Sequence, residues 1–253
     1  MTILAFVVSA LLPATLWAQS ESRIQLLHSD RLYHDTEIGA RAQILVGNVQ
    51  FRHDDVLMYC DSALFYEASN SLDAFGNVRM NQGDTLSLAG DVLFYNGLDK
   101  LARVRNNVVL VHGKTTLYTD SLDYDRLYNV GYFFEGGHLV TQDNDMTSDW
   151  GEYRPETKVA VFNYNVHLVS PAPPQKARTT LLTDTLYYNT VTSVANASGP
   201  STIDDGACHI YTELGYMNSK NNDLTLLLRS EMSNDGKKLI GDSIVWNSVD
   251  SIG

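Results

Sequence analysis

The chain has little positive charge and little proline. Of its 253 residues, 18 are Lys or Arg and 30 are Asp or Glu, which gives a formal net charge of −12, and six are Pro. A surface of this sign argues against electrostatic binding of nucleic acid or of anionic membranes. The abundance of Tyr, 14 residues, and the scarcity of Pro favour strands joined by polar turns.

Long apolar runs are absent beyond residue 17. The one such run extends from Ile3 to Trp17 and is followed by small and polar residues, Ala18-Gln19-Ser20. It is too short to span a membrane comfortably and predicts a signal peptide over residues 1–19, although no basic residue precedes Arg23. The alternative is a buried N-terminal element. We expect residues 20–253 to form one exported domain, either as a fragment of a longer protein or with an end that another subunit continues.

Motifs of common enzymes and metal sites are also missing. The stretch His112-Gly113-Lys114-Thr115 resembles the end of a phosphate-binding loop, but Val108 stands where that loop needs its first glycine. The seven His residues have no metal-ligand spacing. Asp143-Asn144-Asp145 lacks the glycine of a calcium loop and is better interpreted as a solvated turn. We therefore predict no catalytic residue, no metal and no cofactor.

What the chain does contain is an internal repeat. Gly-Asn-Val or a variant of it begins at Gly47, Gly76, Asn106, Gly136 and Tyr164, at intervals of about 30 residues. A small or acidic residue followed four places later by an aromatic forms a second marker. Its eight occurrences are Ser29/Tyr33, Asp61/Phe65, Gly90/Phe94, Asp120/Tyr124, Asp149/Tyr153, Asp184/Tyr188, Thr212/Tyr216 and Asp242/Trp246.

The phase of the repeat predicts strands. Apolar or small residues recur two places before the marker, two places after it and four places after it, which is period two. We expect an all-β fold in which antiparallel strands stack in about eight repeats of ~30 residues, like the units of a solenoid. The proline-rich stretch from Ser170 to Pro174 accounts for the one longer repeat as an exposed loop.

The repeated stretches resemble a known family. The succession GNVQFRHDDVLMYCDSALFYEASNSLDAFGNVRM, followed by GDVLFYN and TDSLDYDRLYN, is similar to the OstA-like (organic solvent tolerance) family over roughly residues 24–250. The resemblance implies a β-jellyroll open along one side, in the periplasm, whose interior holds acyl chains of lipopolysaccharide. It also implies transport of lipopolysaccharide toward the outer membrane. The implied partners are other jellyroll proteins, either a copy of this chain or the outer-membrane translocon, joined by addition of edge strands.

In the proposed stack, equivalent inward side chains form an apolar trough. If its walls splay, the trough is a lipid slide; if they close, it is a filled core. The expected trough residues are Tyr59, Phe65, Leu88, Val92, Phe94, Tyr118, Leu122, Tyr124, Tyr153, Leu186, Tyr188, Leu214 and Tyr216. Two alternatives remain: a β-solenoid carbohydrate enzyme, which needs a local cluster of acids and bases, and an adhesive or structural solenoid with a closed core.

Acidic residues and cysteines complete the expectations. Asp61, Asp120, Asp149, Asp184 and Asp242 share the parity of the apolar residues, which would turn them inward. Because stacked carboxylates repel one another when dry, we expect them at wet strand corners, bonded to nearby backbone N–H groups. Cys60 and Cys208 lie about five periods apart, or ~24 Å, so we predict two free thiols.

Overall fold

The computed structural model describes residues 22–34, 42–170, 178–221 and 223–246. The predicted signal peptide, residues 1–19, lies outside these ranges, as does most of the proline-rich stretch. All regular elements of the described residues are strands. They are β1 (Gln25–His28), β2 (Arg31–His34), β3 (Gln43–His53), β4 (Val56–Tyr66), β5 (Ser71–Gln82), β6 (Leu86–Asn96), β7 (Leu101–His112), β8 (Thr115–Asp125), β9 (Val130–Phe133), β10 (Gly137–Val140), β11 (Asp145–Ser148), β12 (Trp150–Arg154), β13 (Val159–Ser170), β14 (Thr179–Asn189), β15 (Val194–Asp204), β16 (Cys208–Asn218), β17 (Asp223–Asn234) and β18 (Lys237–Trp246).

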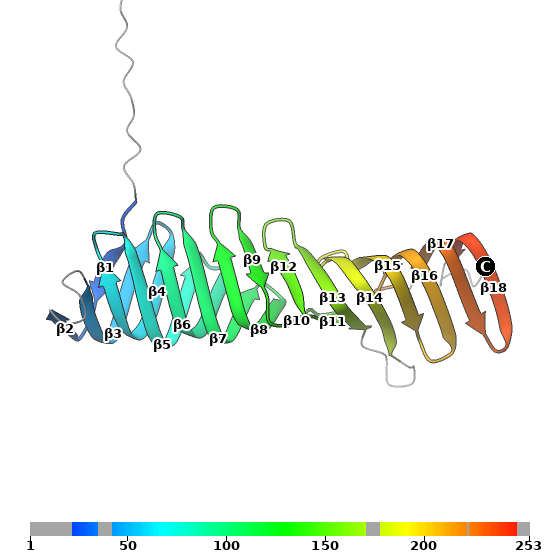
Figure 1. The fold of residues 1–253 in the computed structure, drawn as a ribbon, viewed down its shortest axis with the longest axis horizontal. Coiled ribbons are helices and arrows are strands. Elements are labelled where there is room, and N and C mark those ends of the chain that lie inside the picture. Colours follow the sequence, from blue (N-terminus) through cyan, green and yellow to red (C-terminus); the bar gives the residue numbers. More distant parts are fainter. Residues whose placement is uncertain (1–21, 35–41, 171–177, 222, 247–253) are drawn as a thin grey trace, which may run out of the picture.

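The strands form one continuous antiparallel stack along the long axis of the molecule (Figure 1). From β3 to β8 and again from β13 to β18, each strand pairs with the next in the chain. In between, β8 pairs with both β9 and β10, and β13 pairs with both β11 and β12. The short pairs β1/β2, β9/β10 and β11/β12 thus each take the place of one long strand. The all-β fold of stacked antiparallel strands that the repeat predicts is confirmed.

Each long strand bends at a corner in its middle. At the corner the register shifts, for example between Phe75 and Val78 where β5 pairs with β6. The two residues inserted there, Gly76 and Asn77, have φ angles of +75° and +45°. Only glycine, and to a lesser degree Asn or Asp, adopts this left-handed conformation at low cost. Gly-Asn, or another pair with positive φ, therefore folds β3, β5, β7, β13 and β17 into two arms, whereas β4, β6, β8, β14, β16 and β18 bend without a positive-φ residue.

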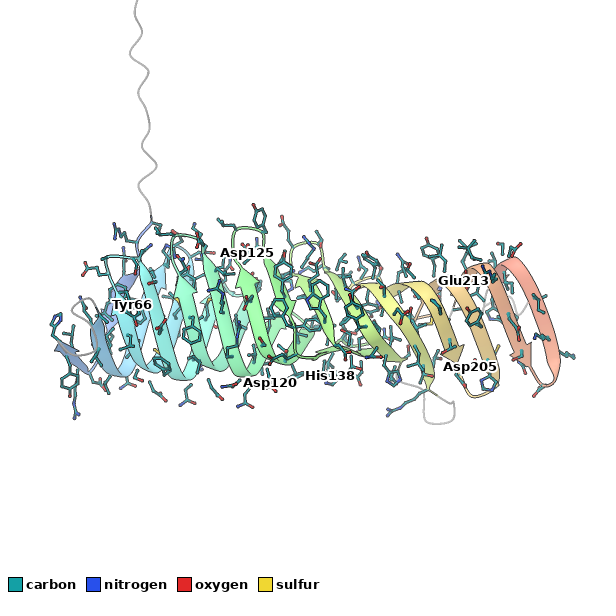
Figure 2. The ribbon with its side chains drawn as sticks, in the orientation of Figure 1. Tyr66, Asp120, Asp125, His138, Asp205 and Glu213 are labelled. Carbon is teal, nitrogen blue, oxygen red and sulfur yellow. The ribbon has the colours of Figure 1, made fainter. Side chains whose placement is uncertain are left out.

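The acidic residues that recur with the repeat lie on the outer, solvent-facing side of the corners. Asp61, Asp120, Asp149, Asp184 and Asp242 are all exposed, so the inward orientation that their parity suggested is wrong. In β4 the alternation of buried residues shifts by one at the corner, from Cys60 to Ala63, and this shift turns Asp61 outward to water. Asp125, beside a turn, and Asp120, beside a corner, lie toward the upper and lower sides of the stack in Figure 2.

The carboxylates at the corners accept hydrogen bonds mainly from a donor other than the backbone N–H groups that we expected. The Asn side chain of the next strand donates to the carboxylate, as from Asn77 to Asp61 (2.8 Å) and from Asn165 to Asp149 (2.6 Å). A backbone N–H donates in one case, from Asn107 to Asp120 at 3.3 Å. In the register of Glu213 an ion pair with Arg229 (3.1 Å) replaces the amide contact.

The two arms of the strands enclose an apolar interior. Side chains alternate along each arm, so that in β4 Val56, Met58 and Cys60 are buried, and beyond the corner Ala63 and Phe65 are buried. Cys60 in β4 and Cys208 in β16 are both free. Among the described residues, no helix has the length and apolar character needed to cross a membrane.

Candidate functional site

The predicted trough residues divide between the interior and the outer surface. The inward ones are Phe65, Leu88, Leu122, Tyr124, Tyr153, Leu186 and Tyr188, each at most 5% exposed. Tyr59, Val92 and Leu214 are half-buried, and Phe94, Tyr118 and Tyr216 are exposed. The interior placement predicted for those last three is wrong.

Two physical causes account for the outward residues. Tyr59 and Tyr118 precede the corner, where the alternation has the opposite phase, so their neighbours Cys60 and Leu117 are buried instead. In the registers of Phe94 and Tyr216 the marker is off by one residue: the residues equivalent to Asp61 are Asp91 and Glu213. The corresponding inward side chains are Tyr95 and Met217, both buried. The same error of one residue explains why Val92 and Leu214 do not point inward as predicted.

The structure forms one column of large inward side chains, which we call the ring column. Its members are Phe65, Tyr95, Tyr124, Tyr153, Tyr188, Met217 and Trp246. Between the tyrosines, the directly paired residues on the intervening strands are small: Ala102, Gly131 and Ala160. Small neighbours on both sides leave room for the rings of Tyr124, Tyr153 and Tyr188 to lie across the interior, whereas Tyr95 has Leu72 on one side.

The groove between the arms has two rims, formed by the turns at the strand ends. The first rim contains the turns after β3, β5, β7, β10, β15 and β17, and the second contains those after β4, β6, β8, β12, β14 and β16. The ring column lies near the second rim. Its tyrosine hydroxyls reach polar side chains of the first rim, and these contacts close the groove.

The first closure is centred on Tyr95. Nε2 of His53 lies 3.1 Å from the carbonyl of Ser22 and must carry the proton, so the Tyr95 hydroxyl donates to Nδ1 of His53 (2.6 Å). Arg126, whose side chain is 3% exposed, donates to the same hydroxyl (2.5 Å) and pairs with Asp55 (2.9 Å). Burial lowers the pKa of His53 and so keeps its ring neutral.

The closure at Tyr153 uses the opposite histidine tautomer. Lys158 can only donate, and its Nζ lies 3.0 Å from Nε2 of His112. Nδ1 of His112 therefore carries the proton and donates to the Tyr153 hydroxyl (2.9 Å). Burial, and then the charge of Lys158, lower the pKa of His112. The imidazole is thus held neutral between a cation and a buried hydroxyl.

Two further tyrosines complete the series. The Tyr124 hydroxyl lies within donating distance of Oε1 of Gln82 on the first rim (3.4 Å) and of Oδ1 of Asn129 on its own rim (3.3 Å). Burial raises the pKa of this hydroxyl to about 12. Asn144 donates from its amide to the Tyr188 hydroxyl (2.7 Å). Asn144 is 1% exposed, so the solvated turn expected at this position is wrong for that side chain.

A second row of contacts starts five residues after Phe65 and after each of the four tyrosines of the ring column. The residues there are Asn70, Lys100, Asn129, Lys158 and Ser193, and all have positive φ. Lys100 pairs with Asp54 on the first rim (2.7 Å), and this hydrogen bond lowers the pKa of Asp54 to about 2. Ser193 donates to Asp143 (2.6 Å). We call both rows together the cross-rim contacts.

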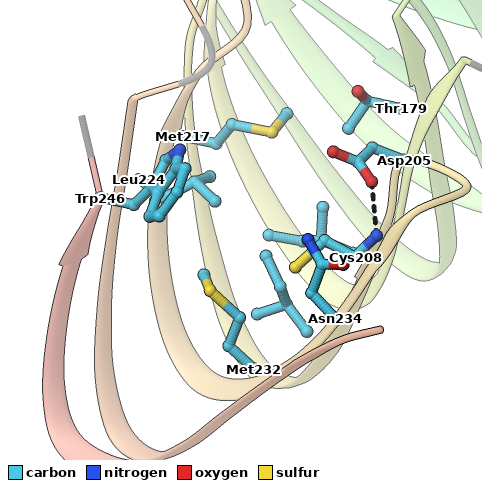
Figure 3. A pocket seen from close by; sticks show the side chains of 10 residues that line it. Thr179, Asp205, Cys208, Met217, Leu224, Met232, Asn234 and Trp246 are labelled. Atoms are coloured by element: carbon cyan, nitrogen blue, oxygen red, sulfur yellow. Dashed lines mark hydrogen bonds between the residues drawn. The ribbon is translucent and has the colours of Figure 1, made fainter. Parts of the chain in front are cut away.

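The groove is hollow at its C-terminal end. There the ring column continues as Met217 and Trp246, neither of which has a hydroxyl, and a cavity of about 200 Å³ lies beside them (Figure 3). Its walls are largely apolar, and Asp205 accepts a hydrogen bond from the backbone N–H of Cys208 (2.7 Å) at its edge. The lining residues are Thr179, Ile203, Asp205, Cys208, Ile210, Met217, Leu224, Met232, Asn234 and Trp246.

Comparisons with known proteins agree with this architecture. Residues 21–173, more than half of the chain, match the family model described as OstA-like protein. The chain belongs to the OstA-like protein family. In addition, residues 130–231 match the model of the LptC-related proteins of lipopolysaccharide assembly. The family membership that the repeated motifs implied is confirmed.

One solved structure and the curated proteins complete the comparison. The crystal structure of LptH, the LptA-homologous periplasmic component of the lipopolysaccharide transport device of Pseudomonas aeruginosa, is 15% identical in sequence with a TM-score of 0.39. The similarity covers 45% of this chain and 81% of LptH. No curated protein matches the chain.

Proposed function

We propose that this OstA-like protein is a non-enzymatic periplasmic carrier that binds acyl chains of lipopolysaccharide on their way to the outer membrane. The observation that supports this most directly is the apolar hollow at the C-terminal end of the groove. A lipid tail needs an elongated apolar cavity with an open side, and the hollow lies between two rims of an extended stack. The matches to OstA-like and LptC-related families favour lipopolysaccharide over other lipids.

The size of the hollow sets the amount of lipid that it takes. An apolar cavity of about 150 Å³ accommodates benzene, with six carbons. The hollow of about 200 Å³ therefore has room for about eight carbons, a segment of one acyl chain. At roughly 0.8 kcal/mol for each buried methylene, such a segment gains about 6 kcal/mol before the cost of association.

The composition of the hollow suits a flexible chain. Met217 and Met232 line it together with Trp246. Methionine side chains adapt to irregular apolar ligands because they are unbranched and have three rotatable bonds. With a formal net charge of −12 the protein does not attract anionic head groups over long distances, so binding rests on the tails.

Partner binding is proposed at the ends of the stack. In the described part of the chain, β18 pairs with β17 alone, so its other side has backbone groups free for a further strand. Ile240 and Val245 on this strand are 68% and 64% exposed. A strand of another jellyroll, from a second copy or a translocon component, would continue the sheet and the groove together.

Photo-crosslinking tests the carrier function. A benzophenone amino acid replaces Met232 or Trp246 in the hollow, and as a control Tyr128, which is 73% exposed on a turn of the second rim. Adducts with purified lipopolysaccharide are expected from the two hollow positions and not from position 128. Adducts from position 128 alone would contradict the proposal. An absence of adducts at all three positions would favour a structural solenoid with a closed core.

A further inference from the structure

We infer that the cross-rim contacts determine where along the groove an acyl chain can lie: they exclude lipid from the registers of Tyr95 to Tyr188 and confine it to the hollow. This inference rests on the proposed function and adds a set of specificity-determining residues to it. Four successive members of the ring column make such contacts, and the two that follow lack a hydroxyl. The hollow lies where the hydroxyls end.

A lipid tail in a closed register would have to separate polar groups that are already out of water. At Tyr95 these are a phenol, the imidazole of His53 and the guanidinium of Arg126, which is 3% exposed. An acyl chain offers none of them a hydrogen bond. Burying polar groups without partners is costly, and for a charged group the cost is greater still. The closed registers therefore reject an acyl chain, which is the kind of ligand that the hollow accepts.

The second row of contacts strengthens the closure because it is built differently. Lys100 and Ser193 start from turns with positive φ and reach carboxylates of Asp54 and Asp143 on the opposite rim. Separating the rims at these points breaks a hydrogen bond to a charged group in addition to the tyrosine contact. By contrast, Met217 in the hollow contributes a thioether, which can move aside without losing a strong partner.

The reaction rates of the two native thiols report on closure of the groove in the absence of lipid. Cys60 is 6% exposed on β4, the strand that follows His53 of the first closure, and Cys208 lines the hollow. With methyl methanethiosulfonate, Cys208 is expected to react at least about tenfold faster than Cys60. Tyr95→Phe removes a hydroxyl that bonds a charged group and should raise the Cys60 rate about tenfold while leaving Cys208 unchanged.

Matched variants keep this measurement decisive. Tyr128→Phe removes an exposed hydroxyl and should change neither rate. Tyr153→Phe opens a second register and serves where Tyr95→Phe does not fold, as judged by circular dichroism. An unchanged Cys60 rate in folded Tyr95→Phe, or, where that variant does not fold, unchanged positions of the fatty-acid adducts in Tyr153→Phe, would overturn the inference.

The lipid measurement uses a 16-carbon fatty acid with a diazirine group and the full chain. Mass spectrometry of peptides should place adducts between residues 203 and 246 in the unchanged protein, and also on peptides containing Leu88 or Leu122 in Tyr95→Phe. Equal adduct yields along the whole groove of the unchanged protein would refute the inference. If neither protein forms adducts, the proposed function fails, and the thiol rates still decide whether the contacts close the groove.

Discussion

Gly76→Ala tests the corner that folds β5 into two arms. Gly76 has φ +75°, and a Cβ placed there would lie 2.6 Å from Oδ2 of Asp61 and 3.1 Å from its Cβ. Gly83 has φ +56° in a turn, and a Cβ there meets nothing within 4 Å. The two glycines therefore share the cost of a left-handed alanine, roughly 1–2 kcal/mol, and differ in whether Asp61 must move.

The difference between the two variants can be worked out. Moving Asp61 weakens its hydrogen bond from Asn77 (2.8 Å), which involves a charged acceptor at an exposed site. We take about 1 kcal/mol for this loss, below the roughly 1.5–3 kcal/mol of hydrogen bonds to charged groups, because the site is exposed and the bond is weakened rather than removed. Gly76→Ala should then lower the free energy of unfolding by about 2–3 kcal/mol, and Gly83→Ala by about 1–2 kcal/mol.

Urea unfolding followed by circular dichroism gives both values. In an Asp61→Ala background the carboxylate is gone, so Gly76→Ala should cost about as much there as Gly83→Ala does in the unchanged protein. Equal costs for the two glycines in the unchanged protein would refute the reasoning, because the carboxylate would then have no part in the corner.

Three other predictions concern the groove. Tyr95→Phe should lower the free energy of unfolding by about 1–3 kcal/mol, since it leaves buried partners unsatisfied, whereas Tyr128→Phe should change it by less than about 0.5 kcal/mol in the same urea assay. The pKa values of His53 and His112 are lowered from 6.5, so below that pH the unfolded chain binds protons that the folded protein does not. The urea midpoint should consequently fall between pH 7.5 and pH 5, and a midpoint that rises would contradict the neutral state of both rings. Met232→Trp should fill the hollow and reduce fatty-acid adducts, and an increased yield would place the lipid elsewhere.

The fold could be predicted from the sequence because its corners and its strands are both encoded locally. Gly76-Asn77 carries the left-handed conformation, and alternation on either side carries the buried face. The phase across the corner could not be predicted, because the alternation shifts by one residue in β4, between Cys60 and Ala63, but keeps its phase across the two inserted residues of β5. In β6 the marker fitted Gly90 as well as Asp91, and only the pairing with neighbouring strands separates them.

The candidate site could be predicted from the sequence only in part. Leu122 and Tyr188 were correctly expected inside, since their registers have an unambiguous acidic marker. The cross-rim contacts join residues far apart in sequence, such as His112 and Tyr153, and no local pattern specifies such a pair. A partial signal for the second row was nevertheless present, because a lysine follows Tyr95 and Tyr153, and an asparagine follows Tyr124, at a distance of five.

The regular pairing of the strands determines how the length of the molecule changes with the number of repeats. Each repeat adds two strands, and adjacent strands are about 4.8 Å apart, so one further unit lengthens the molecule by roughly 10 Å and leaves its cross-section unchanged. Duplication of a ~30-residue segment of the gene is therefore a way to match the span of such a protein to the width of its compartment, in increments of one unit.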